Sequence, residues 1–599
     1  MKPLHVAALV KQIPKFEVMA LGPDGRLQRD GVELSMNPYC QRALSKGIEL
    51  ARATSGQCTV ISLGPPAAED VVRWGVAAGA DSGILISDPA FAGSDTLATA
   101  RALAAVIERC GPFDLILVGK NAVDADTGQV GPELAELLGL PFAAAVRSLE
   151  PDYDGVLRVG CEHDDAWVEA EVPLPAVLST AERLCRPAKV DEPDKAAVPA
   201  EKIRTITSTD LGNGPWGVAG SPTWVGETKV LEVKRERRIL SGALESQVAE
   251  AMALLQARRA LEDTKAEAAH AVGEPVADPV ATIAVFLEPG NTGSARELLG
   301  AAAQIAPQIG ARVAGILVGS ADNTAPQEFY AWGADHLCVL DNAAVEEGIA
   351  HVVASWCGAH SPRCLFAPST SWGREVAARV AARTGSGLTG DAIALEYEDG
   401  QLVSWKPAFG GRLVAAIRST SAIQMATVRP GVLPRPLPRE ARMPSMERHR
   451  MEAASRVRVT SRQRNDQLDA LALASRVVGV GMGIPPERYP ELDPMLAILG
   501  AELATTRKVT DQGWLPHARQ VGITGRSIAP NLYIGMALSG NFNHVCGIQA
   551  AGTVLAINSD PQAAIFEHAD IGVVADWADS VPLLVKAFGK LLSKGVQNR

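Results

Sequence analysis

Short apolar runs alternate with amphipathic stretches from the first residues of the chain onward. Runs that predict β-strands lie at 5–10, 59–63, 83–86 and 114–118, and stretches that predict helices lie between them at 41–53, 67–78 and 97–109. This alternation is typical of βαβ units around a parallel sheet, whose ligands bind at the carboxyl ends of the strands. The sequence therefore predicts an α/β protein.

The same pattern returns later in the chain. The tripeptide Gly-Ala-Asp occurs at 79–81 and again at 333–335, and segment 131–135 has a counterpart at 373–377. The strand near 115–118 likewise has a counterpart at 365–367. These parallels predict two related α/β units on one chain, with chance similarity between alanine-rich helices as the alternative.

Length, charge and cysteine spacing exclude several classes of protein. The 599 residues correspond to about four domains at roughly 150 residues each. Lys and Arg number 57 against 68 Asp and Glu, and the net charge of −11 argues against nucleic-acid binding. No apolar run approaches the ~18 residues of a membrane span. Nine cysteines without a Cys-x-x-Cys pair argue against zinc-ribbon, iron–sulfur and thioredoxin-like centres, and the odd count is typical of a reducing cytoplasm. Any redox chemistry must therefore use a bound organic cofactor.

Polar residues follow several predicted strands in the C-terminal part of the chain. A strand at 531–538 leads into the segment 539–544, a strand at 553–557 ends at Asn558, and a strand at 571–574 ends before Asp576. A Ser-Gly turn that opens a helix presents backbone N–H groups to an anion, although such a turn alone is often only a turn. Thr506-Arg507 and the segment 520–525 precede these strands. Together these elements suit a large, extended nucleotide.

A second candidate loop, 119–131, follows the strand predicted at 114–118. It carries Asp124, Asp126, Thr127, Gly128 and Gln129 before a helix that begins near residue 132. Small residues and backbone donors at the start of a helix suit a phosphate group. A purely structural loop is the alternative.

Three parts of the chain resemble the electron-transfer flavoprotein family. Residues 475–594 are similar to the FAD-binding domain of its α subunit, through segments 510–514, 520–525, 532–534, 539–544, 556–561 and 565–566. Residues 278–432 are similar to the N-terminal domain of that subunit, through 367–374 and 426–431. Residues 1–270 are similar to the β subunit, through 10–14, 36–40, 62–65 and 119–124. The resemblance implies β and α subunits fused in one chain, β first.

The implied architecture has two related nucleotide-binding-type α/β domains and a C-terminal, doubly wound parallel-sheet domain that binds FAD. The expected boundaries are 1–228 for the β-like domain, 229–277 for a helical arm and linker, 278–432 for the α N-terminal-like domain, 433–463 for a second linker and 464–599 for the FAD-binding domain. The second linker would let the flavin domain swing towards a partner.

The resemblance also implies flavin roles. Arg507 would lie against the isoalloxazine and favour anionic reduced flavin by Coulomb attraction, Thr524 would hydrogen-bond flavin N5, and His544 would face the pyrimidine carbonyl. A surface ion pair for Arg507 and a local helix cap for His544 are the alternatives. The complete FAD set is Thr506, Arg507, Gln520, Val521, Gly522, Ile523, Thr524 and Gly525, then Ser539, Gly540, Asn541, Phe542, Asn543 and His544 for the ribityl–phosphate part and pyrimidine, and Asn558, Asp576 and Trp577 for the adenosine end.

The sequence departs from the family pattern at 479–483. This segment reads Gly-Val-Gly-Met-Gly where the family reads Ser-Gly-Gly-Arg-Gly, so Met482 replaces an arginine that would contact the pyrophosphate. Thr506 also stands where the family has serine. We expect FAD to bind, with a weakened or altered pyrophosphate contact.

In the family, the loop at 119–131 binds AMP in simple carriers or a second FAD in electron-bifurcating members. The residues assigned to it by the resemblance are Asn37, Pro38, Tyr39, Cys40, Asp124, Asp126, Thr127, Gly128, Gln129 and Val130. Segment 126–132 is closer to the bifurcating pattern and segment 36–40 to the carrier pattern. The sequence therefore leaves both ligands open.

The arm at 186–205 matches the loop by which the family recognises partner dehydrogenases. Val198 stands before Pro199 where the family anchors a leucine, and the basic residues after it, Lys202 and Arg204, are sparse. A shorter anchor buries less apolar area, worth about 0.8 kcal/mol per methylene. We expect weak, transient docking of the kind that suits electron transfer.

The leading interpretation is an electron carrier without a substrate or catalytic residue of its own. It would take electrons through FAD from flavin dehydrogenases and pass them to a quinone-linked oxidoreductase, in the cytoplasm and without inserting into a membrane. The alternatives are an electron-bifurcating flavoprotein that oxidises NADH at a second FAD, a scaffold that has lost its flavin, and an unrelated α/β nucleotide-binding protein.

Overall fold

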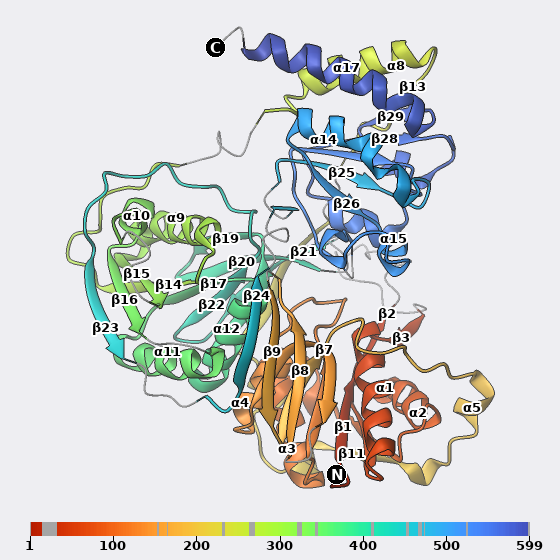
Figure 1. The fold of residues 1–599 in the computed structure, drawn as a ribbon. Helices are drawn as coiled ribbons and strands as arrows, with labels where there is room; N and C mark the ends of the chain where they lie inside the picture. Colours follow the sequence, from red (N-terminus) through yellow and green to blue (C-terminus); the bar gives the residue numbers. More distant parts are fainter. Residues whose placement is uncertain are drawn as a thin grey trace. The chain divides into compact units, whose positions relative to one another are not determined.

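The computed structural model describes residues 2–14, 33–151, 155–164, 166–230, 234–262, 270–319, 326–341, 345–408, 413–450, 455–464, 470–471, 474–522 and 525–596. The chain divides into two compact units. The first consists of Met1–Lys229, His270–Phe409 and Leu413–Arg464, and the second chiefly of Val230–Ala269 and Asn465–Arg599. Helices and strands alternate in both units, which confirms the predicted α/β class (Figure 1).

The first unit begins with a sheet whose first seven strands run parallel. Its strands are β1 (His5–Val10), β4 (Gln57–Leu63), β5 (Ser82–Ile86), β6 (Leu115–Gly119), β7 (Phe142–Pro151), β10 (Ala176–Thr180) and β11 (Ile203–Ile206), and its helices are α1 (Pro38–Ala53), α2 (Glu69–Ala77), α3 (Thr96–Cys110) and α4 (Val130–Leu137). β1 and β6 are almost entirely buried and apolar, as expected where helices cover both faces of a parallel sheet. The strands predicted in this part of the chain are confirmed.

A second parallel sheet in the same unit repeats this arrangement. Its strands are β14 (Ala281–Leu287), β15 (Ala311–Val318), β16 (His336–Asp341), β17 (Cys364–Pro368), β18 (Gly387–Ala392), β22 (Gln424–Val428) and β23 (Ser445–Arg450), and its helices are α9 (Thr292–Ile309), α10 (Pro326–Trp332), α11 (Glu346–His360) and α12 (Ser371–Thr384). The strand order β23-β16-β15-β14-β17-β22-β18 is the order β11-β5-β4-β1-β6-β10-β7 of the first sheet. The predicted internal repeat is therefore real.

The stretch predicted as a linker at 433–463 contains strands. β23 pairs in parallel with β16, and β24 (Arg458–Arg464) pairs antiparallel with β9 (Ala166–Pro173), which follows β8 (Val156–Glu162) at the edge of the first sheet. The rest of this unit consists of the hairpin β2 (Gln12–Pro14) and β3 (Leu34–Met36), the antiparallel sheet of β12 (Thr223–Val230), β19 (Ala394–Glu398), β20 (Gln401–Ala408) and β21 (Leu413–Ser419), and the short helices α5 (Glu192–Ala196), α6 (Ser208–Leu211) and α7 (Gly217–Gly220). This stretch thus ties the edges of both repeats together.

A buried arginine joins the two repeats where α12 packs against α4. Arg379 on α12 has no exposed surface, and its guanidinium lies 3.1 Å from both Glu136 of α4 and Glu375 of its own helix. Arg383, one turn later, reaches the same Glu136 at 2.6 Å. The repeated segments 131–135 and 373–377 lie in the first turns of these two helices.

The second unit is a six-stranded parallel sheet. Its strands are β13 (Arg238–Leu240), β25 (Arg476–Val480), β26 (Glu502–Thr505), β27 (Leu532–Met536), β28 (Thr553–Asn558) and β29 (Ile571–Val574), in the order β13-β29-β28-β27-β25-β26, and its helices are α8 (Leu244–Ala257), α14 (Asp493–Leu499), α15 (Arg507–Asp511), α16 (Phe542–Val545) and α17 (Trp577–Val596). The helical arm predicted at 229–277 supplies β13 and α8, and α8 lies beside α17 (Figure 1). Arg235 from this arm bonds Asp570 at 2.8 Å, and both side chains are buried.

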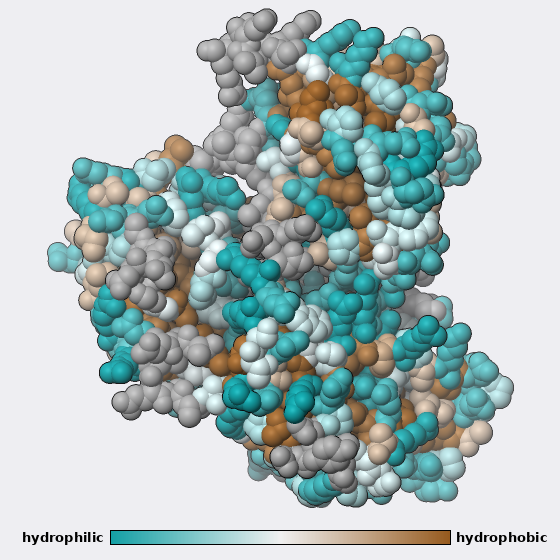
Figure 2. All heavy atoms as spheres, viewed as in Figure 1, coloured by the Kyte–Doolittle hydropathy of each residue, from teal (hydrophilic) through white to brown (hydrophobic). Residues whose placement is uncertain are grey.

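The visible surface mixes hydrophilic and apolar side chains, as Figure 2 shows. Exposed large apolar side chains include Val280 and Met482. Within the described residues, no helix has the length and apolar character needed to cross a membrane.

Candidate functional site

The carboxyl ends of the strands in the second unit meet at one edge of their sheet. β25 pairs in parallel with both β26 and β27, and the chain crosses from β26 on one side of β25 to β27 on the other. Such a switch in strand order opens a crevice at the carboxyl ends, where open α/β sheets bind ligands. The loop 537–544, which carries Ser539 to His544 of the predicted FAD set, and the loop 480–483, where the sequence departs from the family pattern, lie at this switch.

Two glycines bring the backbone of these loops together. Gly540 has a φ of +79°, and a Cβ there would lie 2.1 Å from the backbone nitrogen of Ile565. A Cβ on Gly481 would lie 2.3 Å from the carbonyl oxygen of Ala537. Loops this tightly packed keep main-chain groups at the edge free of side chains, which suits the phosphates of a dinucleotide. Met482, between Gly481 and Gly483, is 40% exposed.

His544 is buried and both of its ring nitrogens have partners in the protein. Nδ1 lies 3.1 Å from the carbonyl oxygen of Val521, and Nε2 lies 2.7 Å from the hydroxyl of Tyr533. A carbonyl only accepts, so Nδ1 carries the proton and Nε2 accepts from the tyrosine. Burial lowers the pKa of His544 to about 4, so the ring is neutral at pH 7. The predicted contact with a flavin carbonyl remains a prediction, and it requires the ring to exchange one of these bonds.

The structure places Arg507 at the start of α15, immediately after β26. Its Nε lies 3.3 Å from Asp511 Oδ2 and its side chain is 41% exposed, so the surface ion pair considered as an alternative is present. Thr506 is the residue before the helix. These contacts leave the stacking of Arg507 on a flavin as a prediction.

The segment that begins at Gln520 packs beneath α16. Gln520 is 1% exposed and its Oε1 lies 2.6 Å from the Thr510 hydroxyl. Gly522 has a φ of +133°, and a Cβ there would lie 2.1 Å from the carbonyl oxygen of Asn543. The structure therefore brings 520–522 and 543–544 together, as the resemblance implies. Ile523 and Thr524 lie outside the described residues, so the predicted bond from Thr524 to flavin N5 is a prediction.

The residues predicted for the adenosine end have structural partners. The side-chain amide of Asn558 donates to the carbonyl oxygen of Leu538 at 2.9 Å and thereby joins the ends of β27 and β28. Asp576 accepts the backbone N–H of Ala578 at 2.8 Å at the start of α17. Trp577 is 5% exposed, and the guanidinium of Arg488 lies 4.4 Å from the centre of its ring. Asn558 and Asp576 reach the carboxyl edge, whereas the Trp577 ring packs into the core.

The second predicted site lies at the switch point of the first sheet, between β1 and β6. Asn37 is fully buried and joins the loops that follow these strands: its Nδ2 donates to the carbonyl of Asn121 at 2.9 Å, and its Oδ1 accepts from the backbone of Val123 at 3.2 Å. Lys11, after β1, forms an ion pair with Asp124 at 2.8 Å. The structure therefore brings 37–40 and 121–130 together.

Several buried polar atoms at this edge have no hydrogen-bond partner within the described part of the chain. They are Gln129 Nε2, Asn121 Oδ1 and, at the carboxyl end of β4, Ser62 Oγ. The loop also contains Asp126 at φ +48° and Gly128 at φ +65°. Because unpaired buried polar atoms are costly, this arrangement suits a polar ligand such as a nucleotide.

The second repeat closes on this loop through Arg374 of α12. Its Nη1 lies 3.8 Å from Asp126, and its Nη2 lies 3.3 Å from Asp391. Burial raises the pKa of Glu133, at the start of α4, to about 8, so this acid is protonated at pH 7. The sequence singled out Glu133 as a member of a repeated segment, and Arg374 as a member of a repeated segment and of the matching stretch 367–374, and neither was expected at the site. Tyr533, the partner of His544, was missed in the same way.

Val198 is not on the surface in this structure. It is 8% exposed and packs into the core of the first repeat, and its carbonyl accepts from Arg73 of α2 at 2.8 Å. Lys202 and Arg204, by contrast, are exposed. Docking through Val198 therefore remains a prediction that requires this side chain to leave the core.

A model of the electron transfer flavoprotein domain matches residues 24–205 and 292–456, more than half of the chain. A model of the electron transfer flavoprotein FAD-binding domain matches residues 470–549. The chain belongs to the electron-transfer flavoprotein family.

Both kinds of subunit are represented among its relatives. Electron transfer flavoprotein subunit alpha of Thermoanaerobacterium thermosaccharolyticum is 32% identical over 306 residues, which cover 49% of this chain and 93% of the relative. Subunit beta of the same organism is 33% identical over 262 residues, which cover 43% of this chain and all of the relative. Protein FixB of Rhizobium meliloti is 33% identical over 312 residues, which cover 49% of this chain and 88% of the relative. The electron-transfer flavoprotein described here is thus a fusion of β-type and α-type subunits, and the predicted resemblance is confirmed.

These matches support FAD as a cofactor and electron transfer as the role of this flavoprotein. The FAD-binding match, 470–549, contains the loops 480–483 and 537–544 that meet at the switch point of the second unit.

Proposed function

We propose that this electron-transfer flavoprotein carries electrons through one FAD, from flavin-dependent dehydrogenases to a quinone-linked oxidoreductase. The observation that carries the proposal is the glycine-lined edge of the FAD-binding domain, where Gly481 and Gly540 hold bare backbone against neighbouring loops. FAD, when bound, supplies the one- and two-electron redox chemistry. The protein supplies binding, orientation and charge.

Each group at this edge has a separate part in the proposal. Arg507 provides a permanent positive charge at the end of β26, which favours an anionic reduced cofactor by Coulomb attraction. Asp511 partly offsets this charge while the pair at 3.3 Å persists. His544 carries its proton on Nδ1, which donates to the Val521 carbonyl, and its Nε2 accepts from Tyr533. Because the ring is neutral at pH 7, it would meet the cofactor as a neutral hydrogen-bonding group, after exchanging one of these bonds, and not as a fixed cation.

The edge between β1 and β6 is proposed to hold a nucleotide, either AMP or a second FAD. Gln129 Nε2 and Asn121 Oδ1, which have no hydrogen-bond partner in the described part of the chain, provide a donor and an acceptor for it. A second FAD would support the alternative function, electron bifurcation with oxidation of NADH, and AMP would support the simple carrier. The resemblance of segment 126–132 to bifurcating members is what favours the alternative.

Partner recognition is proposed to involve the arm at 186–205. Its exposed Lys202 and Arg204 provide positive charge for the surface of a dehydrogenase. The proposed movement of the flavin domain involves the whole second unit, because β13 and α8 belong to that unit and β23 and β24 do not.

Anaerobic reduction separates these functions. The purified protein is mixed with NADH alone, and separately with a flavin dehydrogenase and its substrate, while flavin absorbance is followed. Reduction by the dehydrogenase and not by NADH supports the carrier. Rapid reduction by NADH alone supports bifurcation, and a flavin that neither donor reduces would contradict both.

A further inference from the structure

A cluster of imidazoles lies in the second repeat, two strands away from its β14–β17 switch point. The β16–β23 cluster consists of His336 and Cys338 on β16, Glu447 and His449 on β23, and His360 on α11. Cys338 is opposite Glu447 in the parallel register, and residues two apart on a strand share a face. Four of the five side chains therefore project from two adjacent strands towards the helix that carries the fifth.

The nitrogen atoms of three histidines surround one carboxylate. His336 Nε2 and His449 Nε2 each lie 3.6 Å from Glu447 Oε1, and His360 Nε2 lies 3.8 Å from Glu447 Oε2. These distances exceed the roughly 2.7–3.2 Å of a hydrogen bond. They are close to the separation of ligand atoms around a tetrahedral metal, roughly 3.3–3.4 Å for bonds of about 2.0–2.1 Å.

Two of these histidines present a lone pair to the carboxylate. His360 Nδ1 lies 3.0 Å from the carbonyl of Trp356, so it must carry the proton and leave Nε2 bare. His336 Nδ1 lies 2.8 Å from Ser445 Oγ, whose hydroxyl donates to the carbonyl of Asp335, so His336 also has a bare Nε2. A bare nitrogen facing a carboxylate oxygen is unfavourable unless a cation lies between them.

Burial makes this mismatch costly. His336 is 8% exposed, and its Nε2, like that of His449, has no hydrogen-bond partner among the described residues. A hydrogen bond orients the carboxylate, because Trp356 Nε1 donates to Glu447 Oε1 at 2.5 Å. Metal-ligating side chains are oriented by outer partners of this kind.

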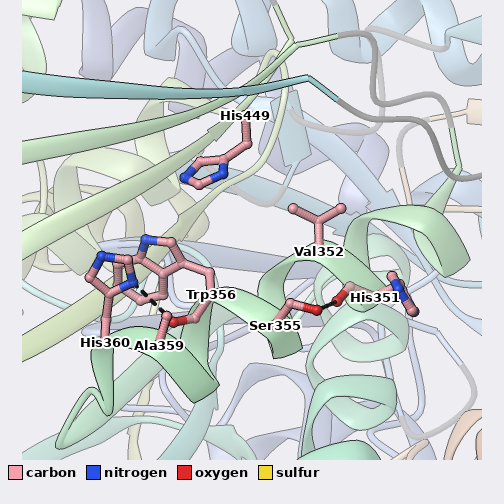
Figure 3. A pocket seen from close by; sticks show the side chains of 7 residues that line it. All are labelled: His351, Val352, Ser355, Trp356, Ala359, His360 and His449. Carbon is pink, nitrogen blue, oxygen red and sulfur yellow. Dashed lines mark hydrogen bonds between the residues drawn. The ribbon is translucent and has the colours of Figure 1, made fainter.

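Sulfur is also within reach. Ligand atoms of Cys338, Glu447 and His449 lie within 4.8 Å of one another. A cavity of about 520 Å³ adjoins the cluster, lined by His449 on one side and by Trp356 and His360 of α11 on the other (Figure 3). His351 also lines this cavity, but its ring points away from His449 and His360 (Figure 3).

We propose that the β16–β23 cluster binds one divalent transition-metal ion of the zinc class. The ligands are the carboxylate of Glu447, the imidazole of His449, the thiolate of Cys338 and an imidazole from His336 or His360. Mixed imidazole, thiolate and carboxylate ligands are characteristic of zinc. The Cys338 thiol releases its proton to solvent as the metal–sulfur bond forms. The ion fastens the edge strand β23 to β16 and α11.

The test uses the full-length protein after metal is removed with a chelator and dialysis. Zn²⁺ is titrated by calorimetry, and Co²⁺ is added as a spectroscopic substitute. We expect one high-affinity ion per chain and a sulfur-to-cobalt charge-transfer band. Glu447→Gln keeps an oxygen for Trp356 yet removes the negative ligand, and His449→Ala removes an imidazole whose side chain is 39% exposed. Each should weaken Zn²⁺ binding by about 100-fold or more, since even outer partners contribute about 10–100-fold.

Two controls isolate the site. His351→Ala changes a residue of the same cavity that is not a ligand, and it should leave the Zn²⁺ affinity unchanged. Cys338→Ser should abolish the charge-transfer band. Unfolding of each metal-free variant is compared with that of the metal-free parent, and His449→Ala carries the test should Glu447→Gln fail to fold. No high-affinity binding, or binding that Glu447→Gln and His449→Ala leave unchanged, would overturn the proposal. Flavin content is measured in parallel and should not change.

Discussion

Replacing Arg379 by methionine tests whether its buried charge holds the two repeats together. Arg379 has no exposed surface, and it lies 3.1 Å from both Glu136 of the first repeat and Glu375 of the second. Methionine keeps much of the volume and removes the charge. The variant therefore leaves two carboxyl groups in the interface without their shared partner.

The expected loss follows from the fate of the two acids. Burial raises the pKa of Glu375 to about 8 although Arg379 opposes that rise, so this carboxyl is neutral at pH 7 with Arg379 present and stays neutral without it. Glu136 keeps a second partner, Arg383, at 2.6 Å. Breaking a buried pair costs about 3–5 kcal/mol. Since one acid is neutralised and the other still paired, we expect the lower end, about 3 kcal/mol of unfolding free energy.

Urea unfolding at pH 7, followed by tryptophan fluorescence, measures this loss, because Trp372 lies on α12 and is 6% exposed. Arg383→Met is the matched control. Its side chain is 36% exposed, and a solvent-exposed pair contributes only about 0–1 kcal/mol. Equal losses in Arg379→Met and Arg383→Met, or a loss below about 1 kcal/mol in the former, would refute the reasoning.

Three further predictions concern the second unit. Burial lowers the pKa of His544 in the folded state from 6.5 to about 4, so the unfolded chain binds that proton more readily. The free energy of unfolding should therefore fall by up to about 3 kcal/mol as the pH drops from 6.5 to 4. Thermal unfolding of His544→Gln should depend less on pH, and an unchanged pH dependence would contradict the burial of this ring. Arg235→Met should lower the free energy of unfolding by about 3 kcal/mol, the lower end for a broken buried pair, because Asp570 is 1% exposed and still pairs with Arg258 at 3.0 Å. The double variant with Asp570→Asn should restore stability, and urea unfolding measures both. Met482→Arg should tighten FAD binding about 10-fold or more, because one charged hydrogen bond contributes roughly 1.5–3 kcal/mol. Fluorescence titration with FAD measures the dissociation constant. An unchanged dissociation constant would show that residue 482 does not face the pyrophosphate.

The sequence predicted the central strands of the sheets well because these strands are apolar over most of their length. β1, β6 and β27 are buried on both faces, so each appears in the sequence as an unbroken apolar run. β23 and β24 do not. They read Ser-Met-Glu-Arg-His-Arg and Arg-Val-Thr-Ser-Arg-Gln-Arg, since they are edge strands with exposed side chains, and a polar stretch of this kind resembles a linker.

The sequence predicted which loops form the candidate sites, but it did not predict which side chains contact one another there. Strand ends and glycines identified where 480–483, 520–522 and 539–544 gather, and the structure brings them together. The partners that fix individual side chains depend on tertiary packing. In the sequence, Tyr533 looks like any other strand residue, and only the folded structure shows that its hydroxyl bonds His544. Arg379 and Glu136 are likewise 243 residues apart in the sequence. Spacing along the chain carries no signal for such pairs.

The most direct test of the flavoprotein assignment is the amount of nucleotide bound per chain. The purified protein is incubated with FAD, freed of excess ligand and denatured, and the released nucleotides are identified by chromatography. We predict one FAD per chain together with one AMP, or two FAD where the edge between β1 and β6 also binds flavin. A chain that releases no flavin after incubation would contradict the account.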